Sequence, residues 1–250
     1  MDEFLSHMEE EEREFSLEGP TKRPKSRRPL AERLRPLTLD EVRGQEHILG
    51  EGCLLPTLIR ENRVGNMILA GPPGSGKTTL ASVIAAEGGC KLVKVNAVTS
   101  NVADLRDALK MVRYHGAENC YLFVDEIHRF NKAQQDLLLP DVESGEARLI
   151  GATTHNPRYY VIDPLLSRSQ LFALEPLPTD QIEEALSQAL DDKERGLGTR
   201  SCKADKKVLE RVALLAEGDL RRAYNFIETI VEALPEGSKV TEDEGAGVCR

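Results

Sequence analysis

The sequence predicts an α/β fold in which a parallel sheet of five strands is covered by helices on both faces. Five short apolar segments alternate with segments of helical periodicity up to about residue 177, and only helical patterns follow. A glycine-rich loop comes directly after the first apolar segment. Parallel strands need long crossover connections, usually helices, so this alternation favours a sheet that is buried on both faces.

The expected strands are residues 66–71, 91–97, 120–126, 147–154 and 171–177, and the expected helices between them are 77–89, 101–116 and 131–145. Residues 179–196, 203–218 and 219–234 predict three further helices with no strand between them. We therefore expect an N-terminal arm (1–29), an α/β core (30–176) and a small helical lobe (177–250) whose tail from residue 236 shows no helical pattern and is disordered.

Charge is distributed unevenly along the chain. The formal net charge of −9 argues against a protein that coats nucleic acid non-specifically, although a local basic segment can still bind it. Residues 1–18 are acidic and residues 21–35 are basic and interrupted by proline, a composition typical of disorder. Whether this arm binds a partner or is simply solvated stays open.

Targeting and cysteine patterns favour a cytoplasmic protein, nucleoid-associated if it is bacterial. We find neither the pattern of a signal peptide nor an apolar run of the length that spans a membrane, so we expect no membrane partner. The five cysteines are scattered and form no Cys-x-x-Cys pair, which disfavours a disulfide framework and a zinc site. The histidines are equally dispersed.

Residues 71–78, GPPGSGKT, match the pattern of a phosphate-binding loop without exception. Glycines let successive backbone N–H groups point at phosphate oxygens, and the following helix directs its positive N-terminus at them. Lys77 supplies a cation for the β and γ phosphates, and Thr78 a hydroxyl for Mg²⁺. A glycine turn without a ligand is disfavoured by the strand before it and the helix after it. The expected nucleotide-binding residues here are Gly71, Pro72, Pro73, Gly74, Ser75, Gly76, Lys77, Thr78 and Thr79.

A second apolar strand ends in two acids, in the segment YLFVDEIHRF at residues 121–130. We expect Asp125 to lie beside the Mg²⁺ ion and Glu126 to orient and deprotonate a water that attacks the γ phosphate. That the two acids merely cap a strand is disfavoured by the loop upstream. The DEIH letters also occur in helicases, but no second helicase-type lobe follows, so we expect His128 to serve local packing or hydrogen bonding.

Polar residues end a third strand, at Thr153, Thr154 and Asn156. Such side chains can hold the attacking water or sense the γ phosphate, but threonine is also a common strand residue. The residues by themselves leave this choice open.

Two arginine positions have alternative interpretations. Arg168 is either an ordinary surface charge or a finger that reaches the triphosphate of an adjacent subunit. Arg221 and Arg222 begin a helix of the expected lobe, and one of them can fold back over the phosphates.

Taken together, these motifs resemble the clamp-loader branch of the AAA+ ATPases. More specifically, residues 29–50, 67–81, 96–106, 122–136, 149–157 and 165–172 are similar to the replication-associated recombination protein A family, related to the eukaryotic Werner-helicase-interacting protein. The resemblance covers roughly residues 29–235, and the block VDEIHRFNKAQQD is its most specific part. It implies a P-loop AAA+ core followed by a helical lid domain.

The resemblance also implies roles for individual residues. Arg35 and Pro36, with the segment from Val42 to His47 and Ile48, would line the adenine pocket. Thr153 resembles sensor 1, Arg168 the finger acting in trans, and Arg221 sensor 2. The family continues beyond the position of Arg250 into the rest of the lid and an oligomerisation domain, so we expect residues 177–250 to be an incomplete lid.

The function implied is an ATPase, with ATP and Mg²⁺ as cofactors, that acts on DNA in replication-fork maintenance, recombination and repair. The implied partners are forked, gapped or single-strand/double-strand DNA junctions, a single-strand-binding protein or other replisome proteins, and further copies of the chain. A Holliday-junction motor or a clamp-loader subunit shares nearly all these motifs and is the alternative. A nucleotide-gated binding adaptor with negligible turnover is the alternative of another class.

Overall fold

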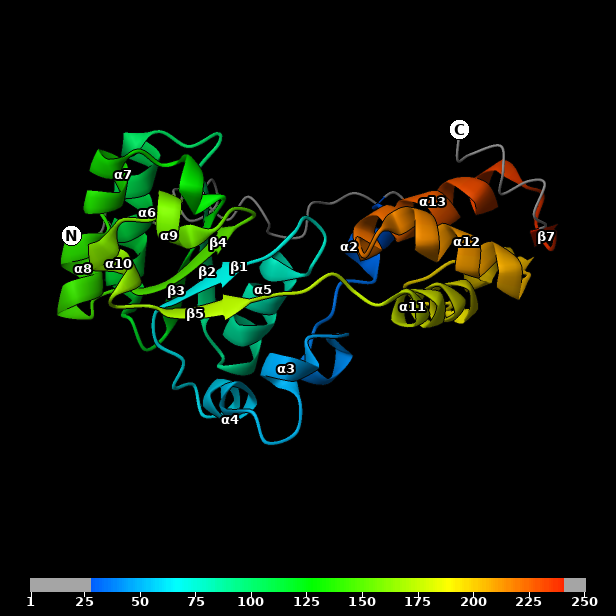
Figure 1. The fold of residues 1–250 in the computed structure, drawn as a ribbon, viewed down its shortest axis with the longest axis horizontal. Helices are drawn as coiled ribbons and strands as arrows, with labels where there is room; N and C mark the ends of the chain where they lie inside the picture. The colour runs from blue at the N-terminus through cyan, green and yellow to red at the C-terminus, as the bar shows by residue number, and fades with distance from the viewer. Residues whose placement is uncertain (1–27, 241–250) are drawn as a thin grey trace, which may run out of the picture. The chain divides into compact units, whose positions relative to one another are not determined.

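The computed structural model describes residues 28–240 (Figure 1). Nearly all of the predicted N-terminal arm, and residues 241–250 of the predicted tail, lie outside the described residues. The described chain forms two compact units. The sheet unit comprises residues 58–70 and 84–172, and the helical unit comprises residues 28–57, 71–83 and 173–240. The predicted boundary near residue 177 stays a prediction, because the two units are discontinuous in sequence.

The five-stranded sheet predicted from the sequence is confirmed. Its strands are β1 (Met67–Ala70), β2 (Lys91–Asn96), β3 (Cys120–Asp125), β4 (Arg148–Thr153) and β5 (Gln170–Ala173), in the order β2-β3-β4-β1-β5. The pairs β2–β3, β3–β4 and β1–β4 are parallel. The register joins Asn96 to Asp125 and Ala70 to Thr153, so the ends of these strands meet at one edge of the sheet.

Burial explains why the central strands are continuous apolar runs. Every residue of β3 before Asp125 is buried, and so is every residue of β4 after Arg148. Helices flank the sheet, as Figure 1 shows, so both faces are removed from water. The helix α6 (Val102–His115) buries Leu105, Ala108, Leu109 and Val112 and begins with a capping box formed by Asn101 and Asp104.

The region after β3 differs from the single helix predicted for residues 131–145. It begins with a short 3₁₀ turn, η3 (Ile127–Arg129), and then forms two helices, α7 (Lys132–Asp136) and α8 (Leu139–Ser144). Pro140 lies in the first turn of α8, where its missing N–H costs no helical hydrogen bond, so a new helix begins there. After β4 come two short helices that were not predicted, α9 (Pro157–Tyr160) and α10 (Asp163–Leu166).

The three predicted helices of the lobe are present in the helical unit. They are α11 (Thr179–Asp191), α12 (Lys206–Ala216) and α13 (Leu220–Ala233), with the turn η4 (Gly198–Arg200) after α11. A two-stranded sheet of β6 (Lys203–Ala204) and β7 (Lys239–Val240) was not predicted, since two-residue strands carry no periodicity. Val240 is fully buried, so the start of the expected tail packs into this core.

Residues before the loop add short elements to the fold. These are α2 (Leu30–Arg33), η2 (Leu39–Glu41), α3 (Glu46–Leu49), α4 (Leu54–Arg60) and, after the loop, α5 (Lys77–Glu87). Leu30 is buried, its N–H donates to the Glu228 carboxylate at 2.9 Å, and Arg33 pairs with the same carboxylate at 3.1 Å. This contact attaches α2 to α13. No helix within residues 28–240 is both long and apolar enough to cross a membrane.

Candidate active site

The loop of residues 71–78 connects β1 to α5 and folds around its own lysine. Gly74 and Gly76 have φ angles of 72° and 92°, a region that favours glycine. Lys77 is buried, and its Nζ donates to the carbonyl oxygens of Gly71 and Pro72, both at 2.8 Å. The loop's own carbonyls thus hold the ammonium where phosphate oxygens would compete for it.

Gly74 has a second constraint besides its backbone angle. A Cβ added there would lie 2.1 Å from the carboxylate of Asp219, which caps α13 by accepting from the Arg222 N–H at 3.0 Å. The start of α13 therefore lies directly against the loop. An alanine at this position would have to displace the Asp219 carboxylate.

Gln45 ties the segment before the loop to the chain after β5. Its side-chain Nε2 donates to the Glu175 carbonyl at 2.8 Å, and its Oε1 accepts from the Glu175 N–H at 2.9 Å. Nearby, the His47 ring lies 2.8 Å from the Ala173 carbonyl oxygen. These contacts fix the segment in which the adenine pocket was predicted.

A cavity of about 870 Å³ opens within the helical unit, with Pro36, Val42, Gly44 and Tyr224 among its lining residues. Burial raises the pKa of the Tyr224 hydroxyl. Arg35, His47 and Ile48 do not line this cavity, so their assignment to an adenine pocket stays a prediction.

The second acidic residue after β3, Glu126, has an unusual backbone and a defined side-chain environment. Its φ angle is 54°, a left-handed conformation that costs a residue with a Cβ about 1 kcal/mol. Its N–H donates to Asp125 Oδ1 at 3.1 Å. The Thr154 hydroxyl donates to Glu126 Oε2 at 3.2 Å, and His128 Nδ1 lies 3.3 Å from the same oxygen. The Thr154 hydroxyl and the His128 ring therefore both contact the carboxylate.

His128 lies at the centre of a polar and aromatic cluster. Its Nδ1 is 3.0 Å from the Thr153 hydroxyl, and its ring centroid is 4.1 Å from that of His155. Tyr160 contacts both rings edge-on, at centroid distances of 5.1 Å from His155 and 6.0 Å from His128. Burial lowers the pKa of His128, because it removes water from the charged ring. The expected hydrogen-bonding role of His128 agrees with this geometry.

Thr153 and Thr154 have different environments although the sequence left their roles equally open. Thr153 is fully buried, and its hydroxyl accepts from the His155 N–H at 3.0 Å. Thr154 is half-buried and contacts Glu126. No sequence pattern singles out His155 or Tyr160 as part of this site. The only available signal was the adjacency of His155 to the two threonines.

The two predicted arginines have opposite surroundings. Arg168 follows α10, is about two-fifths exposed, and pairs with Glu143 at 2.8 Å while donating to the Pro164 carbonyl at 2.9 Å. Arg221 is exposed in the first turn of α13, and within residues 28–240 its guanidinium has no hydrogen bond or ion pair. Arg222 instead pairs with Glu217 at 3.1 Å. The roles of Arg168 and Arg221 stay predictions.

The residues present fit a magnesium nucleotide. Ser75 Oγ in the loop is buried without a hydrogen-bond partner, as expected of a group that awaits a ligand. Taken singly, the Thr78 hydroxyl and the Asp125 carboxylate are oxygen ligands of the kind that Mg²⁺ prefers. Mg²⁺ typically takes one or two protein ligands together with phosphates and water. Among residues 28–240 no group of three or more His, Cys, Asp or Glu side chains could hold a metal ion.

Comparison with known proteins places these features in a family. The model of the Holliday junction DNA helicase RuvB P-loop domain matches residues 34–168. Replication-associated recombination protein A from Escherichia coli K12 is 43% identical over 82% of this chain and 46% of the relative. The Coxiella burnetii protein of that name is 42% identical over 87% of this chain and 50% of the relative. The chain thus spans about half the length of these curated relatives.

More distant relatives agree with this assignment. ATPase WRNIP1 from Dictyostelium discoideum is 37% identical over 85% of this chain and 24% of the relative. The solved structure of the Thermotoga maritima RuvB Holliday junction branch migration motor superposes with a TM-score of 0.70 at 26% identity, covering 86% of this chain and 72% of that one. The resemblance to the replication-associated recombination proteins A is confirmed, and the chain belongs to the RuvB P-loop family of AAA+ ATPases.

Proposed function

We propose that this protein binds ATP with Mg²⁺ and hydrolyses it to act on DNA in replication-fork maintenance, recombination and repair. The observation that carries the hydrolysis is the Glu126 carboxylate, held by the Thr154 hydroxyl at 3.2 Å and by His128 Nδ1 at 3.3 Å. A carboxylate fixed in this way can accept the proton of an attacking water without first reorienting. The relatives' names support the DNA-related part.

Different residues of the chain bind the phosphates, hold the metal ion and accept the proton. The N–H groups of the loop and the Lys77 ammonium bind the phosphates, with the loop carbonyls released from Lys77 as phosphate oxygens take their place. When bound, Mg²⁺ would be held by Thr78 and Asp125 and would offset phosphate charge. Glu126 accepts a proton from the water as the water oxygen bonds to the γ phosphorus. The bridging oxygen of ADP leaves with the electron pair of the broken P–O bond.

Three further roles belong to this proposal. Thr153 acts as sensor 1 through its contacts with His128 and His155, rather than by pointing freely into the site. Arg221, exposed at the start of α13, is available to contact the γ phosphate as sensor 2. Arg168 exchanges Glu143 for the triphosphate of a second copy of the chain. We expect forked or gapped DNA and replisome proteins as partners, in the cytoplasm.

Substitution of Glu126 by glutamine tests this function. Glu126→Gln keeps the size of the side chain but removes the base, so ATP binding should remain while turnover falls by at least about 100-fold. Lys77→Ala is the matched comparison, and it should lose ATP binding itself. ATP affinity and steady-state phosphate release, each with and without forked DNA, measure both. Unchanged turnover in Glu126→Gln would refute the assignment of the base.

The family match favours one second candidate, a Holliday-junction motor, because the matching model and the superposing structure are both of RuvB. Branch migration of a synthetic four-way junction with ATP would support it over fork maintenance. The nucleotide-gated adaptor would be favoured instead if the unmodified chain binds ATP tightly and shows no turnover at any protein or DNA concentration.

A further inference from the structure

Two adjacent tyrosines on α9 are exposed to different extents. Tyr159 is 82% exposed, more than any other large apolar or aromatic side chain reported for residues 28–240, and Tyr160 is 47% exposed. Neither is needed to fill the core, because Pro157 and Val161 provide the buried contacts of this segment. Exposed aromatic rings are informative where polar groups of one kind surround them.

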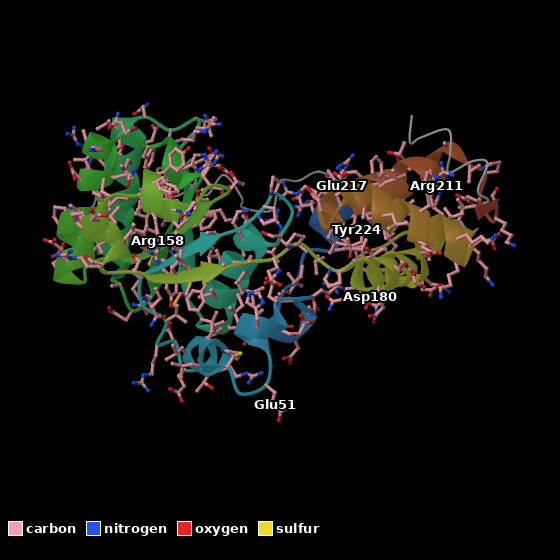
Figure 2. The ribbon with its side chains drawn as sticks, in the orientation of Figure 1. Glu51, Arg158, Asp180, Arg211, Glu217 and Tyr224 are labelled. Carbon is pink, nitrogen blue, oxygen red and sulfur yellow. The ribbon has the colours of Figure 1, made fainter. Side chains whose placement is uncertain are left out.

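Three cations accompany Tyr159. Arg129 ends η3, Lys132 begins α7, and Arg158 lies in α9, where Figure 2 labels it. All three side chains are exposed. Within residues 28–240 none of the three forms an ion pair. In contrast, Arg113, Arg168, Arg195 and Arg222 each have a carboxylate partner. We call Arg129, Lys132, Arg158 and Tyr159 the α9 surface.

A single buried amide holds the segments of the α9 surface together. Gln135 Nε2 donates to the carbonyl of Phe130 at 3.0 Å and to that of Tyr160 at 2.9 Å, and its Oε1 accepts from the Ile162 N–H at 2.9 Å. Gln135 is 1% exposed, so these bonds are shielded from water. The residues next to Phe130 and Tyr160 are therefore neighbours in space although about 30 positions apart in sequence.

We propose that the α9 surface binds single-stranded DNA. The proposal rests on the DNA-directed ATPase proposed above. Three unpaired cations, carried by segments that Gln135 joins, favour a polyanion as the ligand even in a chain of net charge −9. A ring as exposed as that of Tyr159 can stack on a base, and only a single strand presents base faces freely. The pairing of phosphate-binding cations with a stacking ring thus favours a single strand over a duplex or an acidic peptide.

The α9 surface is linked to the base of the hydrolysis reaction. Tyr160, next to Tyr159, contacts His155 at 5.1 Å; His155 contacts His128 at 4.1 Å; and His128 lies 3.3 Å from Glu126. A bound DNA strand that shifts α9 therefore moves the Tyr160 ring, which packs against His128, the residue beside Glu126. Through this contact chain, strand binding raises kcat.

Binding of a fluorescent 20-nucleotide oligo(dT), measured by anisotropy without ATP over a range of salt concentrations, tests the surface. Tyr159→Ala should weaken affinity roughly 5- to 150-fold, the range for one base–aromatic stack. Replacing Arg129, Lys132 and Arg158 together by alanine should reduce the salt slope by about 2, since each phosphate contact on a single strand contributes about 0.7. Tyr114→Ala, at a tyrosine 56% exposed on α6, is the control and should bind like the unmodified chain.

The outcomes separate this proposal from the ATPase. The single-strand surface would be overturned if the unmodified chain did not bind oligo(dT), or if Tyr159→Ala bound oligo(dT) as tightly as the unmodified chain does. It would also be overturned if Tyr159→Ala lost as much affinity for a hairpin duplex as for oligo(dT). An unfolding temperature equal to that of the unmodified chain would show that Tyr159→Ala is folded. Because the binding assay contains no ATP, an absence of ATP turnover would refute only the proposed function.

Tyr160→Leu tests the link between the α9 surface and Glu126. This variant should bind oligo(dT) with unchanged affinity, but oligo(dT) should no longer raise its kcat. If oligo(dT) raised kcat as much as in the unmodified chain, the link would be overturned.

Discussion

At the scale of single residues, Glu126 is constrained both in its backbone and at its carboxylate. Its left-handed backbone, with φ of 54°, turns the chain immediately after β3, and the side chains of Thr154 and of nearby His128 contact its carboxylate. Strained backbone conformations of this kind are retained where surrounding contacts determine them. The Thr154 and His128 contacts therefore act as positioning groups for the base.

Thr154→Val should lower kcat about tenfold with little change in KM, because a hydrogen bond to a charged group is worth about 1.5–3 kcal/mol and valine has the same shape without the hydroxyl. Thr154→Ser keeps the hydroxyl and should restore most of the rate. Steady-state phosphate release measures both variants. Equal rates in the valine and serine variants would show that the hydroxyl does not position Glu126.

His128 should make stability depend on pH. Burial lowers its pKa below the ordinary value of 6.5, so below pH 6.5 the unfolded chain binds the proton first. The free energy of unfolding should therefore fall as the pH decreases from 6.5 towards the lowered pKa. Urea denaturation between about pH 5 and 7.5 measures it, and His128→Gln should flatten this dependence. His47→Gln, at an exposed histidine, is the control and should retain it.

At the scale of elements, the loop between β1 and α5 depends on a helix far along the chain. Gly74 meets the carboxylate of Asp219, the N-cap of α13, and Gln45 bridges to Glu175. The glycine is needed both for its φ of 72° and for this close approach. The loop is therefore shaped by packing as well as by its own sequence.

Gly74→Ala should destabilise the fold and weaken ATP binding more than Gly145→Ala does. Gly145 has a similar φ of 75° but nothing within 4 Å of its added Cβ, so its variant carries only the backbone cost of about 1 kcal/mol. Gly74→Ala must also displace the Asp219 carboxylate. Urea denaturation and ATP titration compare the two; equal losses would mean that the Asp219 contact is unimportant.

At the scale of the whole molecule, residues 28–240 contain one hydrophobic core against the sheet and another among α11, α12 and α13. The proposed finger, Arg168, belongs to the sheet unit, where Glu143 holds it at 2.8 Å. An arginine that acts on a second copy must exchange this partner. Assembly is therefore built into the proposed reaction.

Turnover per chain should rise with protein concentration, and mixed variants should complement one another. Arg168→Ala leaves its own nucleotide site intact, while Lys77→Ala leaves its own Arg168 intact. Each variant alone should be nearly inactive, but their mixture should regain part of the activity, because the Lys77→Ala copy supplies the missing arginine. Phosphate release across mixing ratios measures this. A mixture no more active than its parts, with wild-type turnover independent of concentration, would refute the trans role.

The sequence by itself determined the five strands, the three lobe helices, the loop and the Asp125–Glu126 pair. Each of these features is predicted by local periodicity or by a motif of residues adjacent along the chain, whose relative positions follow from the local backbone geometry. The break between α7 and α8 was also local, at Pro140, but the apolar run around it suggested one helix.

Only the tertiary structure decided which side chains surround the reactive groups. Thr154 reaches Glu126 because β4 lies beside β3, Asp219 reaches Gly74 because α13 begins against the loop, and Gln135 joins the segments that carry Arg129 and Tyr159. These contacts join residues 25 to 145 positions apart. Their geometry depends on how the elements pack and on hydrogen bonds that exist only once the core has excluded water, and no local pattern encodes it.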